Sequence, residues 1–209
     1  MNNLINASGS LNELLEKNTG ANFVVEKNSN VKISGSFENA STISFELEEN
    51  SHLDLAIDET KNNHAINAKL IFKLLGSGAK LTAKINVCGT DNRKIRISTT
   101  QEHVHSDTAS NLEIRSALQD DSQFECHSTV RVPAHLENIE ARQVNRNIII
   151  GGNPQVKTRP ALEVKTQNAM CSHGAVTKRL NANDLMYLQS RGLSKDAAIR
   201  SFLAAFLNI

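Results

Sequence analysis

The sequence predicts a mainly β protein whose strands stack as a β-solenoid. One phrase recurs along the chain: a small or polar turn, then apolar residues at alternate positions. It occurs at residues 28–34, 51–57, 77–87 and 121–132. Alternation sends successive side chains to opposite faces of a strand, so Leu53 and Leu55 share one face and Asp54 lies on the other. Strands this short cannot bury a face alone, whereas stacked coils bury it together.

The composition supports a narrow core. Hydrophobic residues make up 39% of the 209-residue chain, which has seven Phe, one Tyr and no Trp. Many small aliphatic contacts must therefore form the interior, as in stacked β architectures. A β-sandwich has a similar period and is the alternative. Irregular turn spacing and the lack of a two-residue Asn-Gly or Asp-Gly hairpin turn favour the solenoid.

Residues 1–20 are expected to form a short helical segment. Ser10 and Glu13 have capping-box spacing, in which each side chain hydrogen-bonds a free backbone amide of the other residue. This spacing predicts a helix over 11–17, with Gly20 as its end.

The β-solenoid core is predicted over residues 21–179. The apolar period changes to two at Asn22, and further strands are expected at 41–47 and 93–98. Helical spacing returns in residues 180–209, which form the third segment.

This last segment predicts a helical hairpin. Asn181 and Asp184 can cap a first helix that Gly192 closes, and Ser194 can cap a second. The first helix carries Leu185 and Leu188, and the second carries an apolar stripe of Ile199, Phe202, Leu203 and Phe206. Such a face needs a surface to cover it, either the solenoid itself or another protein.

The charge balance excludes several classes of protein. The chain has 23 basic and 22 acidic residues, a net charge of +1, and no long run of one sign. A nucleic-acid binder would show a basic stripe with stacking aromatics, and a membrane-bound protein a polybasic surface or an apolar span of about 20 residues. No secretory signal is recognisable at the N-terminus. Three widely spaced cysteines indicate a reducing, cytoplasmic setting without disulfides.

Cys171 and His173 form the candidate site. They flank one serine in "AMCSHGAV", and residues i and i+2 of a strand point to the same side. Thiolate and imidazole suit iron or zinc, and an iron–sulfur cluster accepts either ligand. Two groups are half a site, so the remaining ligands would come from elsewhere in the fold or from a partner. The alternatives are a nucleophile with its base, or two ordinary strand positions.

Other cysteines and histidines predict less. Cys126 and His127 are adjacent, so their side chains face opposite ways, and Cys126 is expected in the core. Cys88 is expected to be structural. His103 and His105 could share a metal, but such a pair in a polar segment is more typical of a surface.

Two enzymatic functions find little support in the sequence. A Cys–His hydrolase with Cys171 as its nucleophile stays open, although nothing marks an oxyanion hole. The chain has no phosphate-binding G-x-x-x-x-G-K loop, so no nucleotide is expected to bind it.

From about Arg93 onward the chain resembles the SufB/SufD family of iron–sulfur cluster assembly scaffolds, and SufD more than SufB. Four pieces carry the resemblance, in the family's order and at fitting spacing. They are "SALQDDSQFECHSTVRVP" (116–133), "ARQVNRNIIIGGNPQVKTRPALEV" (141–164), "CSHGAV" (171–176) and "LNANDLMYLQSRGLSKDAAIRSFLAAF" (180–206). Residues 1–92 match only loosely, and the family's usual longer N-terminal helical region is missing.

The resemblance implies a right-handed parallel β-helix that pairs with a SufB-type subunit or with a second copy of itself. It implies that the C-terminal helices dock a SufC-type ATPase, through residues drawn from Leu185, Tyr187, Leu188, Phe202 and Phe206. His173 falls where SufD carries a histidine proposed to help hold the nascent cluster, and Cys171 is the family's cysteine before it. His103 falls at the family's Asp-His position, with Glu102 in place of the Asp and Ser106-Asp107 in place of a Pro-His.

The expected function is therefore a non-enzymatic SufD-like scaffold that handles a transient iron–sulfur cluster, or iron, at a subunit interface. The expected partners are the ATPase and the second subunit, with no nucleic acid and no membrane. The rivals are a degenerate family member that only binds partners, and the Cys–His enzyme.

Overall fold

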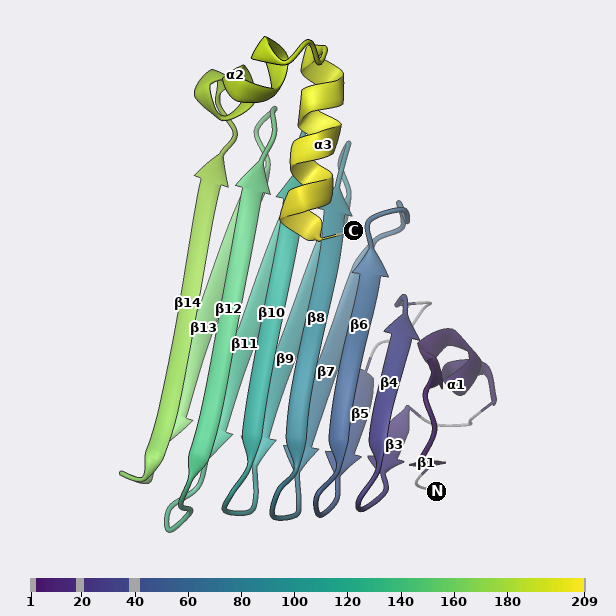
Figure 1. Cartoon of the computed structure of the whole chain (residues 1–209), viewed down its shortest axis with the longest axis vertical. Coiled ribbons are helices and arrows are strands. Elements are labelled where there is room, and N and C mark those ends of the chain that lie inside the picture. The colour runs from purple at the N-terminus through teal and green to yellow at the C-terminus, as the bar shows by residue number, and fades with distance from the viewer. Residues whose placement is uncertain (1–2, 18–20, 38–41, 209) are drawn as a thin grey trace.

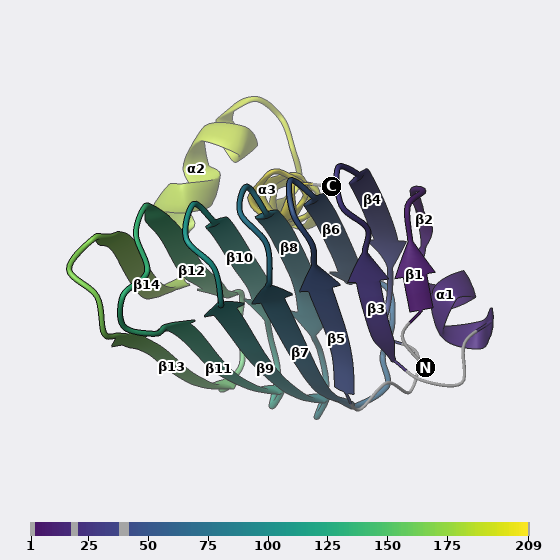
Figure 2. The same ribbon diagram turned by 90° about the horizontal axis from the view of Figure 1, so that it is seen from below.

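The computed structural model describes residues 3–17, 21–37 and 42–208, and it confirms the predicted β-solenoid. Its strands alternate between two seven-stranded sheets, which face each other in Figure 2. The odd sheet contains β1 (Asn3–Ile5), β3 (Asn22–Val25), β5 (Thr42–Leu47), β7 (Ile66–Leu74), β9 (Lys94–His103), β11 (Gln123–Val132) and β13 (Gln155–Val164). The even sheet contains β2 (Gly9–Ser10), β4 (Asn30–Gly35), β6 (His52–Glu59), β8 (Lys80–Gly89), β10 (Ala109–Leu118), β12 (Ile139–Ile149) and β14 (Ala169–Arg179).

Every neighbouring pair of strands in these sheets is parallel. A sandwich built from hairpins would be antiparallel, so that alternative is wrong. Each strand pairs with the one two places along the chain, which makes one coil out of one odd and one even strand. Side-chain alternation holds as predicted: Leu53 and Leu55 are buried, and Asp54 lies on the outer face.

The core between the sheets is more aromatic at its N-terminal end than the composition suggests. Phe23, Phe45 and Phe72 occupy neighbouring coils and stack on one another, with ring centroids 5.5 and 5.8 Å apart. All three are fully buried. With Phe37 and Phe124, which are also buried in the core, five of the seven phenylalanines belong to the interior.

The bends from odd to even strands are built on a left-handed backbone position. One such residue recurs in each of five successive bends, with φ between 52° and 74°: Asn28, Asn50, Gly78, Asp107 and Asn138. Asn, Asp and Gly tolerate this conformation best. The amide of Asn50 donates to the carbonyl of Ser77 in the next coil (2.8 Å), and the amide of Gly78 to that of Asp107 (2.9 Å). The bends therefore continue the hydrogen bonding of the sheets.

The two ends of the solenoid differ (Figure 1). Helix α1 (Leu11–Lys17) is confirmed where the sequence predicts it, and its buried Leu11 joins the core at the N-terminal end. The predicted helix end at Gly20 lies outside the described residues. β1 and β2 already pair with β3 and β4, so the solenoid begins before residue 21. At the other end, β13 and β14 each have one neighbour in their sheets, and the last coil is open.

The C-terminal hairpin is also confirmed. Helix α2 (Ala182–Ser190) starts with a capping box between Asn181 and Asp184, and α3 (Lys195–Leu207) is capped by Ser194. Helix α3 lies on the outer face of the even sheet, over β8 and β10 (Figure 1). No helix in the described chain is long and apolar enough to cross a membrane.

The solenoid itself covers most of the apolar stripe of α3. Ala198 and Leu207 are buried against Ala117 and Ile148 of the even sheet. The Asn86 amide donates to the carbonyl of Leu207 (2.8 Å), and the Arg115 guanidinium donates to that of Phe206. These bonds satisfy carbonyls that a helix C-terminus leaves free.

Candidate functional site at the open end of the solenoid

Cys171 and His173 lie on the inner face of β14, the last strand of the even sheet. In the register with β12, Cys171 is beside Ala141 and His173 is beside Gln143, and both of these neighbours are buried. The two side chains therefore face the interior, as the i, i+2 spacing predicts. Because no further coil follows, they face it at the open end, where His173 is exposed.

The side chain of Cys171 packs against apolar residues. It packs with Leu162 and Val164 of β13 against the buried Val132 and Ala141 of the preceding coil. Burial raises the pKa of the Cys171 thiol. In the described part of the chain, no three His, Cys, Asp or Glu side chains come together as a metal site. The pair thus offers at most two ligands, and a metal centre here would need further ligands from another subunit.

His173 instead continues a lane of polar side chains that runs through the last coils. The lane consists of buried, inward-facing residues on four strands: Thr99, Gln101, His103, Ser110, Ser116, Ser128, Gln143, Asn145 and Asn147. Gln101 donates across the narrow interior to Ser110 (2.7 Å), and Ser116 donates to Asn147, its neighbour in the same sheet (2.7 Å). Asn147 also donates to Thr177 of β14 (3.1 Å), so the lane reaches the open end.

The sequence analysis missed this lane. In "RQVNRN" (142–147) polar residues occupy the inward positions as well as most outward ones, so no apolar alternation marks β12 as a core strand. The signal that could have located it is the register: Gln143 and Asn145 are aligned with Leu112 and Ile114 of the preceding even strand.

His103 is in this lane, and the surface placement expected for it is wrong. It is fully buried at the end of β9, where its Nδ1 contacts the Thr108 hydroxyl (2.8 Å) and its Nε2 the Ser110 hydroxyl (2.9 Å). Burial lowers its pKa to about 4. Ser110 lies two even strands inside Cys171, about 10 Å at the usual strand spacing. His105, by contrast, is exposed in the following bend, so the two histidines do not share a side.

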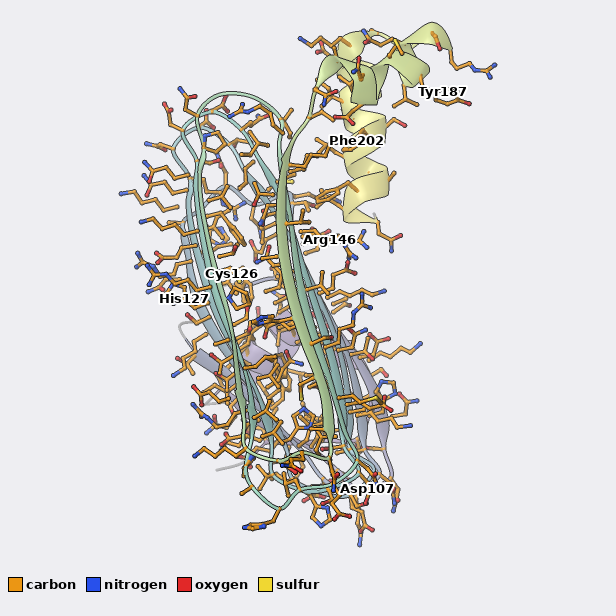
Figure 3. All side chains as sticks on the ribbon, turned by 90° about the vertical axis from the view of Figure 1, so that its left-hand side faces the viewer. Asp107, Cys126, His127, Arg146, Tyr187 and Phe202 are labelled. Carbon is orange, nitrogen blue, oxygen red and sulfur yellow. The ribbon has the colours of Figure 1, made fainter. Side chains whose placement is uncertain are left out.

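Of the other cysteines, Cys126 lies in the core, as predicted, and Cys88 is partly buried. Cys126 is buried inside the solenoid and His127 lies on the outer face beside Glu125 (3.0 Å), which Figure 3 shows as opposite directions. Burial raises the pKa of both Cys88 and Cys126 to about 11. All three cysteines are free. Burial also raises the pKa of the Cys171 thiol, whereas a nucleophilic cysteine has a lowered one, so this site gives the Cys–His enzyme no support.

The residues expected to dock an ATPase divide into two groups. Leu185 is buried, and Leu188, Phe202 and Phe206 pack against the solenoid or the neighbouring helix. Tyr187 is 66% exposed (Figure 3), and beside it Met186, which the sequence analysis did not single out, is 64% exposed. The free apolar surface of the hairpin is therefore on α2.

Comparison with known proteins agrees with this architecture. The family model described as SUF system FeS cluster assembly, SufBD core domain, matches residues 5–206. The chain belongs to the SufBD family. This match includes residues 5–92, where the sequence resemblance alone was loose.

Individual SufBD relatives match shorter stretches. The chain is 36% identical to an iron–sulfur cluster assembly SufBD family protein of Synechocystis over 77 residues, 37% of this chain and 17% of that protein. It is 27% identical to the iron–sulfur cluster assembly protein SufD of Escherichia coli over 92 residues, 44% and 22% of the two chains. A SufBD family protein of Mycobacterium bovis matches at 25% over 152 residues, 63% and 38%. The matches thus span less than half the length of these relatives.

Proposed function

We propose that this chain is a SufD-like scaffold of a cytoplasmic Suf system, which pairs with a SufB-type subunit or a second copy and holds a nascent iron–sulfur cluster at the junction. The observation that carries the proposal is the Cys171–His173 pair on the inner face of the open last coil. A cluster is the cargo of this site, not a resident cofactor.

The open end supports pairing. β13 and β14 carry unpaired backbone groups along strands of 10 and 11 residues, and such edges pair readily with another chain. α1 covers the other end, so one end of the solenoid is available. A partner coil placed on the last one would bury His173 and Cys171 and bring in the further ligands that two side chains alone do not supply.

The pair offers two different ligand environments. The thiol of Cys171 lies among aliphatic side chains, which disfavour its charged form until a metal replaces the proton. The imidazole of His173 is exposed and lies beside the polar side chain of Gln143, and it can bind a metal through a ring nitrogen. Thiolate and imidazole together suit iron.

The hairpin supports ATPase docking through α2. Met186 and Tyr187 present apolar surface outward, while α3 is tied to the even sheet through Asn86 and Arg115. An ATPase that binds α2 and changes shape with ATP would therefore move the hairpin against β8 and β10, in the same sheet as β14. That motion would strain the paired end and open the site to iron and sulfide.

Co-purification with a SufC-type ATPase tests the docking step. Met186→Asp with Tyr187→Asp should abolish capture, because both exposed side chains would be lost. Asn183→Asp with Gln189→Asp adds the same charge at exposed positions of α2 and should retain it. Capture unchanged by the first pair would refute docking through α2.

A second measurement separates the scaffold from a module that only binds partners. Cys171→Ser with His173→Ala should keep the complex intact but abolish the cluster absorbance of the reconstituted complex. An unchanged cluster yield would favour the binding-only member of the family.

A further inference from the structure

The outer face of the odd sheet carries an uneven distribution of charge. Within the first halves of the strands β7, β9, β11 and β13, leaving aside the exposed Asp91, Asp120 and Asp121 of the bends before them, five exposed basic side chains lie with one carboxylate, that of Glu125. We call this set the basic face: Lys69, Lys94, Arg96, Lys157 and Arg159. Five positive charges and one negative give this area a formal +4, against +1 for the entire chain. The rest of the molecule is therefore net negative.

The basic face is not neutralised within the chain. Glu125 accepts from Arg96 (3.1 Å) and contacts His127 (3.0 Å), and the hydrogen bond from Arg96 lowers the pKa of its carboxyl. Among the residues that the structure describes, no carboxylate forms an ion pair with Lys69, Lys94 or Lys157.

The other end of the same sheet serves as a comparison. There Arg131 pairs with Glu163 (2.7 Å) and lies 4.0 Å from Glu102, and Lys73 pairs with Glu46 (2.9 Å). Arg131 and Lys73 are thus matched by carboxylates of neighbouring coils, whereas Lys69, Lys94 and Lys157 are not.

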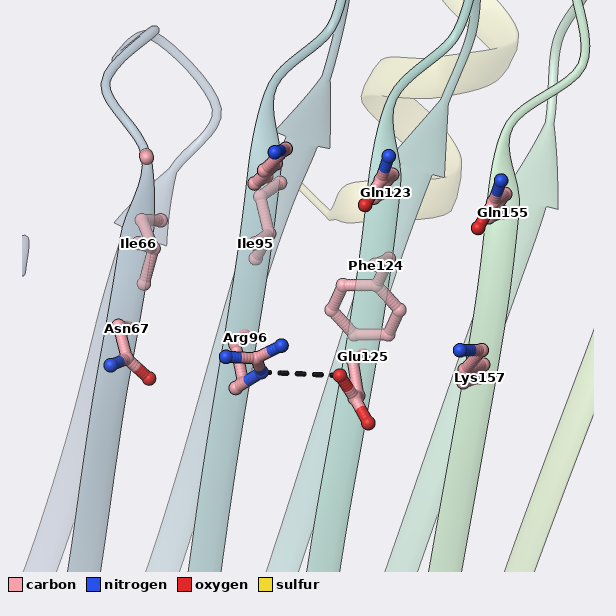
Figure 4. Close-up of a pocket in the computed structure, with 11 residues that line it drawn as sticks. Ile66, Asn67, Ile95, Arg96, Gln123, Phe124, Glu125, Gln155 and Lys157 are labelled. Carbon is pink, nitrogen blue, oxygen red and sulfur yellow. Dashed lines mark hydrogen bonds and ion pairs between the residues drawn. The ribbon is translucent and has the colours of Figure 1, made fainter.

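Strand register arranges the basic face in rows that cross the sheet. Arg96, Glu125 and Lys157 are neighbours in one row, and Lys94, Gln123 and Gln155 in the next. Between the rows lies a hollow of about 240 Å³ whose floor is formed by Ile66, Ile95 and Phe124 (Figure 4). The hollow therefore runs across four coils, with ammonium, guanidinium and amide groups along its sides.

This chemistry fits an extended acidic peptide. Arg96 and Lys157 are two strands apart, about 10 Å, which is close to the rise of one three-residue turn of an extended polyproline II segment. Residues i and i+3 of such a segment point to the same side. Carboxylates at every third residue could therefore meet both cations, while Gln123 and Gln155 hydrogen-bond peptide groups of the same segment. A single-stranded nucleic acid would need aromatic platforms, whereas Phe124 is only 1% exposed and faces inward.

We propose that the basic face and its hollow bind an acidic, extended segment of a partner protein. This site lies on the sheet opposite to α3 and away from the inner face of β14, so it stands independently of the proposed scaffold function. Because the cations are exposed, binding should weaken as salt rises.

Fluorescence anisotropy with defined probes tests the proposal. We expect the full chain to bind a fluorescein-labelled (Glu-Ser-Gly)₄ peptide at low salt. Its affinity for (Gln-Ser-Gly)₄ and for an oligothymidylate of similar length should be lower. Lys94→Glu with Lys157→Glu should lower the affinity for the acidic peptide by about tenfold or more, because two attractive charge interactions become repulsive.

A matched variant controls for overall charge. Lys32→Glu with Lys80→Glu makes the same charge change at exposed positions of the even sheet, and should alter peptide affinity by less than about twofold. Equal losses in the two variants, or no binding of the peptide at low salt, would overturn the proposal. Tighter binding of the oligothymidylate than of the acidic peptide would show that the basic face binds nucleic acid, and the acidic-peptide proposal would be wrong.

Discussion

At the scale of single residues, His103 is the ionisable side chain whose burial has the clearest consequence for stability. Both ring nitrogens contact hydroxyl groups inside the solenoid, and its pKa is lowered to about 4. The unfolded chain would bind a proton near the ordinary histidine value of 6.5, whereas the folded chain stays neutral. The unfolded state therefore binds more protons between these two pKa values, and the free energy of unfolding falls as the pH is lowered through this window.

Because of His103, we expect the free energy of unfolding to fall by about 2 kcal/mol when the pH is lowered from 7 to 5. His103→Gln should remove this part of the pH dependence and lower the stability at pH 7 by about 1–3 kcal/mol, because one hydroxyl loses its partner. Urea unfolding followed by circular dichroism at both pH values measures the difference. The exposed His105→Gln should behave as the wild type, and an unchanged pH dependence in His103→Gln would contradict the burial argument.

At the scale of elements, turns decide how the strands are connected. The bend between β12 and β13 contains Gly151 and Gly152, of which only Gly152 has a positive φ, 69°. A Cβ at Gly152 would also lie 2.5 Å from the backbone of Asp120 in the preceding coil. At Gly151 nothing lies within 4 Å of such an atom. Two adjacent glycines therefore have different structural requirements.

Gly152→Ala should destabilise the chain by about 2 kcal/mol or more, because backbone strain and a steric clash act together. Gly151→Ala should change the free energy of unfolding by less than about 0.5 kcal/mol, as for a surface substitution. Thermal unfolding of the two variants beside the wild type provides the measurement. Equal effects at the two positions would show that the bend adapts to a side chain.

The same elements show how far the sequence could predict the structure. Apolar alternation in 51–57 and 121–132 was sufficient to predict these strands and which of their faces is buried. Capping residues such as Asn181 were sufficient to predict where the C-terminal helices begin. Apolar alternation could not identify β12, whose inner face is polar, nor the burial of His103, which depends on hydroxyls supplied by the next strand. The direction of Cys171 and His173 followed from spacing, but their place at an open end depends on how many coils follow.

At the scale of the whole molecule, the solenoid changes character from one end to the other. Phenylalanine stacking and α1 make the N-terminal coils apolar and covered, whereas the last coils enclose a polar lane and end open. In a stacked protein each coil contacts mainly its neighbours, so stability need not be uniform along the axis. The open end is thus expected to be the less stable one until a partner covers it.

Phe45→Ala and Phe124→Ala test this gradient from the two ends. Each removes a fully buried ring, Phe45 from the N-terminal stack and Phe124 from β11 near the open end, at a cost of about 3–5 kcal/mol. We expect Phe45→Ala to speed amide hydrogen exchange mostly in β3, β5 and β7, and Phe124→Ala mostly in β9, β11 and β13. If both variants speed exchange equally along the whole chain, the solenoid unfolds as one cooperative unit, and a locally weaker open end would have to be abandoned.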